Sequence, residues 1–293
     1  MSEVDAIDQE PEGTSRMVSS GSVRLHVEEY VGEQRHETPV LLIHGFPDSG
    51  VLWRPQIRAL VAAGFRVIVP DSRGFGRSDR PAEVKDYVIS EPREDMIAVL
   101  DAFDIPVAHV VGHDWGATVA WQVAIFHPER VKTLAALSVP HPRAPQTLRQ
   151  AEMSWYMLFF QFEGIAEATI KDNDWEWLRW FSRGHIDLAR AIADLSRPGA
   201  LTAALNWYRA NLAPRMPGPL PELPPVTMPT MGVWSEGDQQ LDGERMAMSG
   251  DLVSGPWRHE VISDSSHWIS IDAPDRLNEL LLDWLLSNPG AAS

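Results

Sequence analysis

The sequence GHDWG at residues 112–116 constrains the fold more than any other stretch of this chain. It follows the apolar run VAHVV (residues 107–111) and leads into residues 117–126, whose composition favours a helix. A buried strand that passes through a tight Gly-x-nucleophile-x-Gly turn into a helix forms a nucleophile elbow, which holds its middle residue at the tip of the turn. The pattern therefore predicts a strand, a sharp turn and a helix, with Asp114 as the candidate nucleophile.

An aspartate in this position limits the chemistry. A carboxylate that attacks an alkyl carbon forms an ester, which water can hydrolyse at the carbonyl. A serine in the same place would form an ether, which water cannot cleave. Asp114 therefore favours substrates with an electrophilic sp³ carbon, such as epoxides or alkyl halides.

Length and composition set broad limits on the rest. A chain of 293 residues can bury one large core with a modest insertion. The formal net charge of −16 argues against nucleic acid and anionic membrane surfaces as partners. The lack of cysteine excludes disulfides, thiolate metal sites and a cysteine nucleophile. The ten histidines show no paired ligand spacing, so no metal or other cofactor is expected.

Residues 1–17 are predicted to form a disordered acidic tail. The first 13 residues carry several acidic side chains and no basic one, whereas a signal peptide needs a basic region followed by an apolar one. No apolar stretch approaches the ~18 residues of a membrane span. The expectation is a soluble, cytoplasmic protein without membrane association.

Apolar runs alternate with helical patterns along most of the chain. Strict alternation predicts an antiparallel strand at residues 23–27. Continuous apolar runs predict buried strands at residues 39–43, 66–70, 107–111, 131–139, 230–234 and 258–262. Helical patterns fall at residues 53–63, 91–103, 117–126 and 274–286. This alternation predicts an α/β fold with a mostly parallel, doubly wound sheet covered on both faces.

The pattern changes after residues 140–142 (PHP). From residue 143 to 225 there are helical stretches, a Pro-rich end and no convincing buried strand. The sequence therefore predicts a helical cap at residues 143–225, inserted into a core formed by residues 18–142 and 226–293. A cap over the carboxyl ends of the strands would lie above the elbow.

Two further residues complete a catalytic triad with Asp114. Asp238 follows one predicted strand and His267 follows another, and the order nucleophile, acid, base is the one used with this elbow. His267 would take a proton from water, and Asp238 would hold its tautomer and stabilise the imidazolium. Either residue alone is more simply a capping or surface residue, but their joint position and order favour catalysis.

The sequence HGFP at residues 44–47 follows a predicted central strand. The backbone N–H groups of Phe46 and Trp115 would form an oxyanion hole for a tetrahedral intermediate. The same four residues would also serve as an ordinary turn, so they support the fold more than the substrate.

Taken together, these motifs resemble a soluble epoxide hydrolase of the α/β-hydrolase superfamily. The resemblance spans residues 18–286 and depends on HGFP, GHDWG, DSRGFGRSD at residues 71–79, YMLFFQ at residues 156–161 and NWYR at residues 206–209. In that family, two cap tyrosines donate hydrogen bonds to the epoxide oxygen, and Tyr156 and Tyr208 match their positions. The residues alone leave both open as core aromatics, although a phenol with a pKa near 10 can protonate a developing alkoxide.

The resemblance implies an enzyme that converts an epoxide into a vicinal diol through an Asp114 ester. Its site would comprise Asp114, His267, Asp238, Tyr156 and Tyr208, with Phe46 and Trp115 also against the substrate. The expected partners are a small apolar epoxide and water, with no cofactor and with a homodimer left open.

Two alternatives remain at this stage. A haloalkane dehalogenase would share Asp114 and Trp115, but Phe46 offers no side-chain donor for a halide and the two tyrosines would not be needed. A non-catalytic receptor for a small ligand could use the same fold, since fold does not fix function. Such a receptor would have no reason to keep the complete triad.

Overall fold

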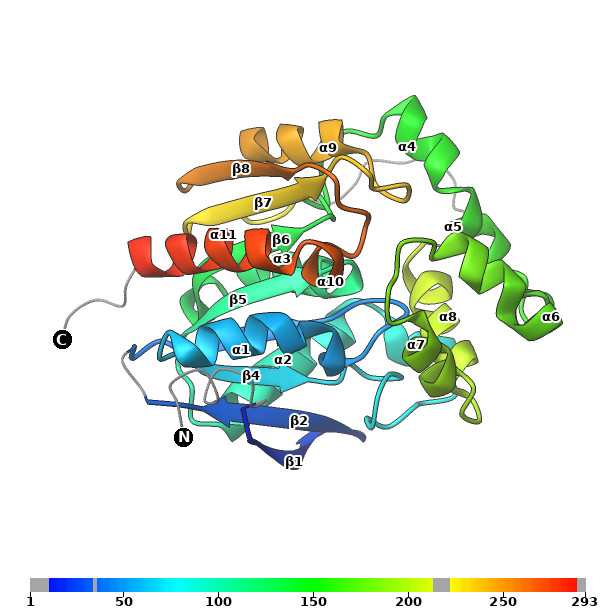
Figure 1. Ribbon diagram of the computed structural model, residues 1–293, viewed down its shortest axis with the longest axis horizontal. Helices are drawn as coiled ribbons and strands as arrows, with labels where there is room; N and C mark the ends of the chain where they lie inside the picture. The colour runs from blue at the N-terminus through cyan, green and yellow to red at the C-terminus, as the bar shows by residue number, and fades with distance from the viewer. Residues whose placement is uncertain (1–10, 34–35, 213–221, 289–293) are drawn as a thin grey trace, which may run out of the picture.

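A computed structural model describes residues 11–33, 36–212 and 222–288 of the chain (Figure 1). In this part of the chain the strands form an eight-stranded sheet in the order β1-β2-β4-β3-β5-β6-β7-β8. The strands are β1 (Gly13–Ser20), β2 (Val23–Val31), β3 (Val40–Ile43), β4 (Arg66–Pro70), β5 (Ala108–His113), β6 (Val131–Leu137), β7 (Thr230–Ser235) and β8 (Trp257–Ile262). The pairings β1–β2 and β2–β4 are antiparallel, and the remaining pairs are parallel.

The register of the parallel strands brings their carboxyl ends to one edge of the sheet. Ile43 pairs with Gly112, His113 with Leu137, and Ser235 with Ile262. Every residue of β3 and β5 is buried, as expected of strands covered on both faces. The loops that follow β3, β5, β7 and β8 therefore emerge close together.

Helices cover both faces of the sheet and divide the core in two. Helices α1 (Arg54–Ala62), α10 (Ile269–Asp272) and α11 (Pro274–Ser287) pack on one face, and α2 (Ser90–Ala102) and α3 (Trp115–Phe126) pack on the other (Figure 1). Helix α9 (Gly243–Met248) contacts β7. Short 3₁₀ turns are η1 (Gly50–Trp53), η2 (Val84–Tyr87), η3 (Pro128–Arg130) and η4 (Ser249–Leu252).

A helical insertion separates β6 from β7. It contains α4 (Leu148–Met153), α5 (Trp155–Phe159), α6 (Ile165–Phe181), α7 (Leu188–Leu195) and α8 (Ala200–Asn211), with α6 interrupted by non-helical backbone at residues 172–175. Figure 1 shows α5 to α8 beyond the carboxyl ends of the strands. The insertion is thus placed to cover the loops that leave this edge of the sheet.

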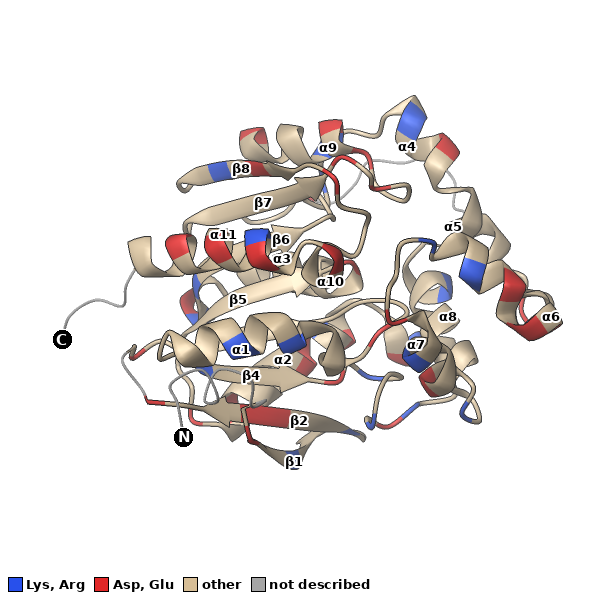
Figure 2. Cartoon of the chain, in the orientation of Figure 1, with Lys and Arg blue, Asp and Glu red and all other residues tan. Residues whose placement is uncertain are grey.

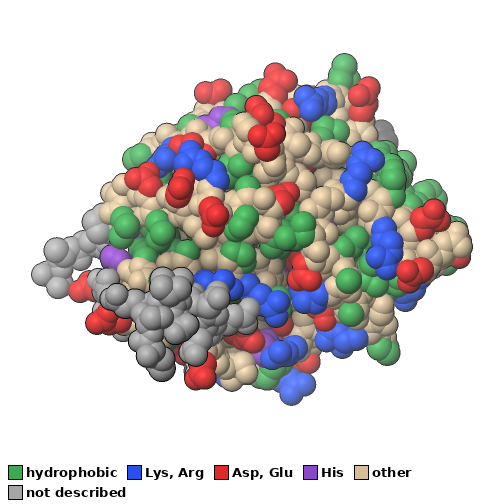
Figure 3. Space-filling view, in the orientation of Figure 1, with side chains coloured by type: hydrophobic (Ala, Val, Ile, Leu, Met, Phe, Trp, Pro, Cys, Tyr) green, Lys and Arg blue, Asp and Glu red, His purple; other side chains and the backbone are tan. Residues whose placement is uncertain are grey.

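The surface reflects the composition of the chain. Figure 2 shows acidic residues on β2, α6, α9 and α11, so the negative charge is spread over several elements. Large apolar side chains that remain exposed include Trp155, Leu158, Phe162 and Trp180 of the insertion, and Figure 3 shows apolar side chains along that end of the molecule. No helix in the described ranges is long and apolar enough to cross a membrane.

The predicted α/β fold is confirmed, and most predicted strands and helices fall within a few residues of their observed bounds. The prediction of a disordered tail up to residue 17 is wrong for residues 13–17, which form the first part of β1. This strand escaped prediction because it is a polar edge strand: its sequence GTSRMVSS buries only Val18 and pairs with β2 alone. Residues 1–10 of the predicted tail, and residues 213–221 of the predicted cap, lie outside the described residues.

Candidate active site

The elbow places Asp114 between the end of β5 and the start of α3. Asp114 has φ 53° and ψ −123°, a conformation that costs a non-glycine residue about 1–3 kcal/mol. The flanking glycines are sterically required. A Cβ on Gly112 would lie 2.2 Å from the carbonyl oxygen of Gly116, and a Cβ on Gly116 would lie 2.0 Å from that of Ile43. The turn thus brings the Asp114 carboxylate to the tip of the elbow, and the backbone of Asp114 is strained as a result.

His267 and Asp238 reach Asp114 from the loops after β8 and β7. The Nδ1 atom of His267 lies 2.8 Å from Oδ2 of Asp238, and its Nε2 atom lies 3.6 Å from Oδ2 of Asp114. The other Asp238 oxygen accepts hydrogen bonds from the backbone N–H groups of Gln240 and Leu241, at 2.8 and 2.9 Å. Asp238 is therefore fixed, and it directs the imidazole so that Nε2 faces Asp114.

The charges of these three residues are strongly linked. Burial lowers the pKa of His267, but Asp238 and then Asp114 outweigh burial and raise that pKa to about 10. Burial likewise raises the pKa of Asp114, but the hydrogen bond and charge of His267, with a hydrogen bond from the Trp115 backbone, bring it below its usual range. At neutral pH the resting site therefore holds an ionised Asp114 beside a protonated His267.

The two predicted oxyanion donors both contact Asp114. The Phe46 N–H donates to Oδ1 of Asp114 at 2.7 Å, and the Trp115 backbone also donates to this carboxylate. The close approach of Phe46 to Asp114 requires a glycine at position 45, because a Cβ added to Gly45 would lie 2.3 Å from Asp114 Oδ1. The loop is anchored by His44, whose Nε2 accepts a hydrogen bond from the Ser72 N–H at 2.9 Å, and the Phe46–Pro47 peptide is cis.

Tyr156 of α5 and Tyr208 of α8 meet above the elbow. Their ring centroids are 6.0 Å apart, and the Tyr208 ring lies edge-on to Trp115 at 5.1 Å. Each tyrosine is only 3% exposed. Burial, reinforced by the negative charge of Asp114, raises the pKa of both phenols well above the ordinary value. Both hydroxyls are consequently protonated at neutral pH and can act as hydrogen-bond or proton donors.

The structure thus brings together all seven residues that the sequence indicated. Asp114, His267, Asp238, Phe46 and Trp115 come from core loops and the start of α3, whereas Tyr156 and Tyr208 come from the insertion. Apolar aromatics enclose the tyrosines, namely Phe46, Phe160, Phe181 and Trp115. Among the residues that are described, no group of histidine and carboxylate side chains is arranged to hold a metal ion.

Sequence reasoning missed the buried carboxylate of Asp48. Asp48 accepts a hydrogen bond from His185 Nε2 at 3.1 Å and one from Arg190 at 3.3 Å, and both donors belong to the insertion. The only signal in the sequence was an acidic residue directly after HGFP. Asp48 ties the insertion to the loop that carries Phe46.

His113, which directly precedes Asp114, makes contacts that fit a structural role. Its Nε2–H donates to the carbonyl oxygen of His267 at 2.8 Å. Burial, together with the charge of His267, lowers the pKa of His113 to about 4, so its ring is neutral. His113 therefore supports the loop that carries His267 without carrying charge itself.

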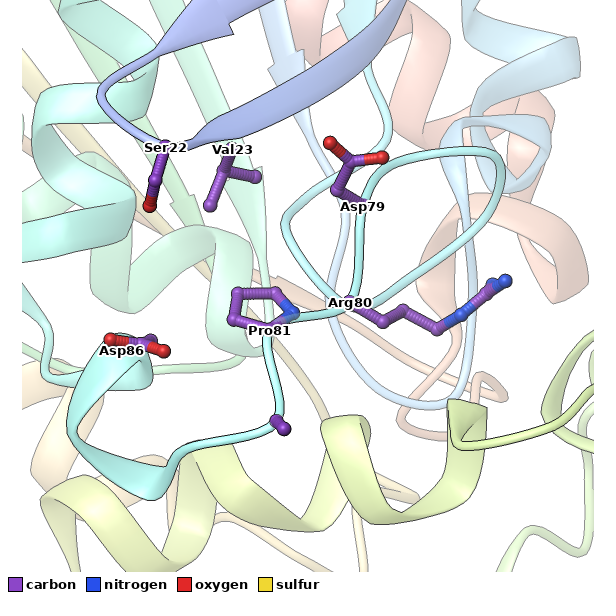
Figure 4. Close-up of a pocket in the computed structure, with 7 residues that line it drawn as sticks. Ser22, Val23, Asp79, Arg80, Pro81 and Asp86 are labelled. Carbon is purple, nitrogen blue, oxygen red and sulfur yellow. The ribbon is translucent and has the colours of Figure 1, made fainter.

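A surface hollow lies away from these residues. It has a volume of about 380 Å³ and is lined by Ser22, Val23, Asp79, Arg80, Pro81, Ala82 and Asp86 (Figure 4). None of the seven site residues lines it, and its Asp79 already pairs with Arg24 at 3.1 Å. The chemically coherent site is the buried one around Asp114.

Comparison with known proteins agrees with this site and fold. Residues 38–175 match the family described as the alpha/beta hydrolase fold. The chain is 35% identical to the AB hydrolase superfamily protein YfhM of Bacillus subtilis, over 92% of this chain and 97% of that protein. It is 31% identical to Epoxide hydrolase A of Mycobacterium tuberculosis, over 93% of this chain and 97% of the relative. The crystal structure of Epoxide Hydrolase A from Mycobacterium thermoresistibile superimposes with a TM-score of 0.79 at 28% identity, covering 94% of this chain and 98% of that one.

The fold and these relatives define an α/β hydrolase. More specifically, the chain belongs to the epoxide hydrolase group of the α/β-hydrolase family. The family inferred from the sequence motifs is thereby confirmed.

Proposed function

We propose that this protein converts an epoxide into a vicinal diol through a covalent ester on Asp114. One observation carries the proposal: the Asp114 carboxylate is flanked by the His267–Asp238 pair and faced by the hydroxyl-bearing rings of Tyr156 and Tyr208. A nucleophile, a base and two acids with these properties suit ring opening followed by ester hydrolysis. The helical insertion would act as a cap that supplies the acids and excludes bulk water.

In the first step, Asp114 attacks one epoxide carbon. Its oxygen Oδ1 is held by Phe46, so the attacking atom is Oδ2. A bond forms between Oδ2 and the carbon, and the carbon–oxygen bond of the ring breaks with its electron pair on the epoxide oxygen. Tyr156 and Tyr208 bind that oxygen, and one of them donates the proton that converts the alkoxide into a hydroxyl.

In the second step, His267 activates water. Esterification removes the negative charge of Asp114, which is one of the causes that raise the pKa of His267 to about 10. The pKa of His267 therefore falls, and His267 releases its proton. This proton replaces the one that the tyrosine donated, so the tyrosine hydroxyl is restored. Neutral His267 then takes a proton from water, and the resulting hydroxide attacks the ester carbonyl while Phe46 and Trp115 stabilise the oxyanion. Collapse of the intermediate breaks the ester bond between the Asp114 carbonyl carbon and the oxygen of the product. The leaving alkoxide takes the proton of the new Asp114 carboxyl group, so the diol departs from an ionised Asp114 beside a protonated His267.

The covalent route is tested by a single turnover in ¹⁸O-labelled water with enzyme in excess over styrene oxide. Water attacks the ester carbonyl, so the label should enter Asp114 in the first turnover and the diol only in later ones. Label found in the diol and not in Asp114 would refute the ester intermediate. Asp114→Ala should form no diol, and His267→Gln should accumulate the ester, visible as a mass increase of the intact protein.

Halide release from a bromoalkane, measured in parallel, separates the proposal from a dehalogenase. Diol formation from styrene oxide without halide release is the expected result. Halide release without diol would show that Tyr156 and Tyr208 have been assigned the wrong role.

A further inference from the structure

A largely buried ion pair joins α8 to α6 within the insertion, and its arginine, Arg209, directly follows Tyr208 in the chain. Arg209 and Glu167 form two parallel hydrogen bonds, from Nη1 to Oε1 at 2.8 Å and from Nη2 to Oε2 at 3.0 Å. Their side chains are 5% and 12% exposed. Such a paired arrangement is among the stronger and more directional polar contacts in proteins.

The same guanidinium binds two further groups. Its Nε–H donates to the carbonyl oxygen of Phe160 at 3.0 Å, and Nη1 also donates to Oδ1 of Asn206 at 3.1 Å. Glu167 in turn accepts a hydrogen bond from the Gly164 N–H at 2.8 Å, which caps the start of α6. Arg209 thereby joins α8 to the end of α5 and to the first turn of α6.

Helix α8 is attached to the core without Arg209. The indole N–H of Trp207 donates to the carbonyl oxygen of Arg73 at 3.1 Å. Asn211 donates to the carbonyl oxygen of Tyr87 at 2.9 Å and accepts from the Ile89 N–H at 2.8 Å. Tyr208, on the same helix, therefore has a fixed position that does not depend on the ion pair.

Helix α5 is held at its two ends. Its start follows α4, where Gln150 donates to the carbonyl oxygen of Gln240 at 2.9 Å. Its end is linked to α8 through Arg209 and through Gln161, whose side-chain amide donates to the carbonyl oxygens of Met157 at 2.9 Å and Tyr208 at 3.3 Å. A helix of five residues has little rigidity of its own, so these end contacts set where its side chains point.

We propose that Arg209, through Glu167 and the carbonyl of Phe160, is a positioning residue that sets Tyr156 at its working distance from Tyr208. The proposal rests on the proposed function, in which the two hydroxyls must converge on one epoxide oxygen. It assigns to one ion pair a role in ring opening and none in ester hydrolysis, because Asp114, His267 and Asp238 all belong to the core.

The test uses the two chemical steps separately. In stopped-flow single turnovers with styrene oxide, ester formation and ester decay are followed by intrinsic tryptophan fluorescence. Arg209→Met should slow ester formation about 10- to 100-fold, the loss expected from a misplacement of about 1 Å. Ester decay should stay within about twofold of the parent enzyme. A merely unstable variant would instead lower the amplitude of the burst, which counts competent sites, and leave the rate constants unchanged.

Arg179→Met is the matched control. Arg179 also lies in the insertion and pairs with Asp174 at 3.1 Å, but this pair is exposed. Arg179→Met should change neither the rate constant of ester formation nor that of ester decay. Arg209→Lys keeps the positive charge but loses the planar guanidinium that forms two parallel hydrogen bonds, and Glu167→Gln keeps one of the two acceptors. Each variant should slow ester formation less than Arg209→Met does and leave ester decay unchanged. These two variants provide the test should Arg209→Met fail to fold.

A double-mutant cycle identifies the residue through which Arg209 acts. Arg209→Met combined with Tyr156→Phe should be hardly slower than Tyr156→Phe alone, whereas its combination with Tyr208→Phe should approach the product of the two single effects. Additive losses with Tyr156→Phe, or equal slowing of ester formation and decay, would overturn the proposal and leave the proposed function intact. Full-rate ester formation in Tyr156→Phe itself would instead remove Tyr156 from the mechanism, and the role of Arg209 with it.

Discussion

The charge on Asp114 should control the pKa of His267, and the size of the effect follows from the geometry. The Asp114 Oδ2 and His267 Nε2 atoms are 3.6 Å apart. Two unit charges at that distance attract by about 4–5 kcal/mol at an effective dielectric constant of about 20. This free energy corresponds to about 3 pK units. Starting from a pKa of about 10, neutralising Asp114 should bring His267 to about 7.

Asp114→Asn reproduces that neutralisation without substrate. The pKa of His267 is measured from the pH dependence of its imidazole Cε1 signal in protein carrying ¹³C-labelled histidine, with His267→Gln identifying the resonance. The parent protein should titrate near pH 10 and Asp114→Asn near pH 7. A pKa that stays near 10 in Asp114→Asn would contradict the argument, because His267 would then remain protonated in the ester and could not act as a base.

Three further predictions address stability. The pKa of His267 is about 10 in the folded protein and near 6.5 in an unfolded chain. Its stabilising effect is therefore complete below pH 6.5 and is lost as the pH rises towards 10. The difference in unfolding free energy between the parent protein and His267→Gln should shrink over that range. Burial raises the pKa of Asp48, but His185 and Arg190 bring it below its usual range, so its contribution is present at neutral pH and lost on acidification. Asp48→Asn should lower the unfolding free energy by about 3 kcal/mol in urea titrations at pH 7, and by less at pH 3; an equal loss at both values would contradict this account. Gly116→Ala should cost about 3 kcal/mol in the same assay, since its Cβ meets the Ile43 carbonyl at 2.0 Å, and a cost below about 1 kcal/mol would show that the elbow can relax.

The sequence predicted those features that depend on neighbouring residues or on a pattern repeated along the chain. The elbow is recognisable from Gly112, Asp114 and Gly116, which lie within five consecutive residues, although the atom that excludes a Cβ at Gly116 is the carbonyl oxygen of Ile43 on the neighbouring strand β3. The buried strands are recognisable because parallel strands covered on both faces are apolar throughout. Strand β1 lacks that signal, since an edge strand with one buried residue has a composition like that of a loop.

The contacts that shape the site could not be predicted from the sequence, because they join segments that lie far apart in the chain. No spacing rule connects Tyr156 to Tyr208, and only the family resemblance paired them. The links from Arg209 to Glu167 and from Asp48 to Arg190 each cross many residues and depend on how the insertion packs. The interruption of α6 at residues 172–175 falls on Asp172, Asn173 and Asp174, which have low helix propensity and tolerate positive φ, but it was not predicted from the sequence.

In the proposed mechanism, the two chemical steps would have a common trigger. The negative charge of Asp114 raises the pKa of Tyr156, Tyr208 and His267 alike in the resting site. As Asp114 becomes an ester, that charge moves to the epoxide oxygen. A tyrosine proton would then pass to the alkoxide because an alkoxide is a much stronger base than a phenolate, and His267, having lost the neighbouring charge of Asp114, would become a base when water must be activated. In this mechanism the order of the steps would be set by one change of charge on one residue, and the switch from ring opening to hydrolysis would need no movement of the protein.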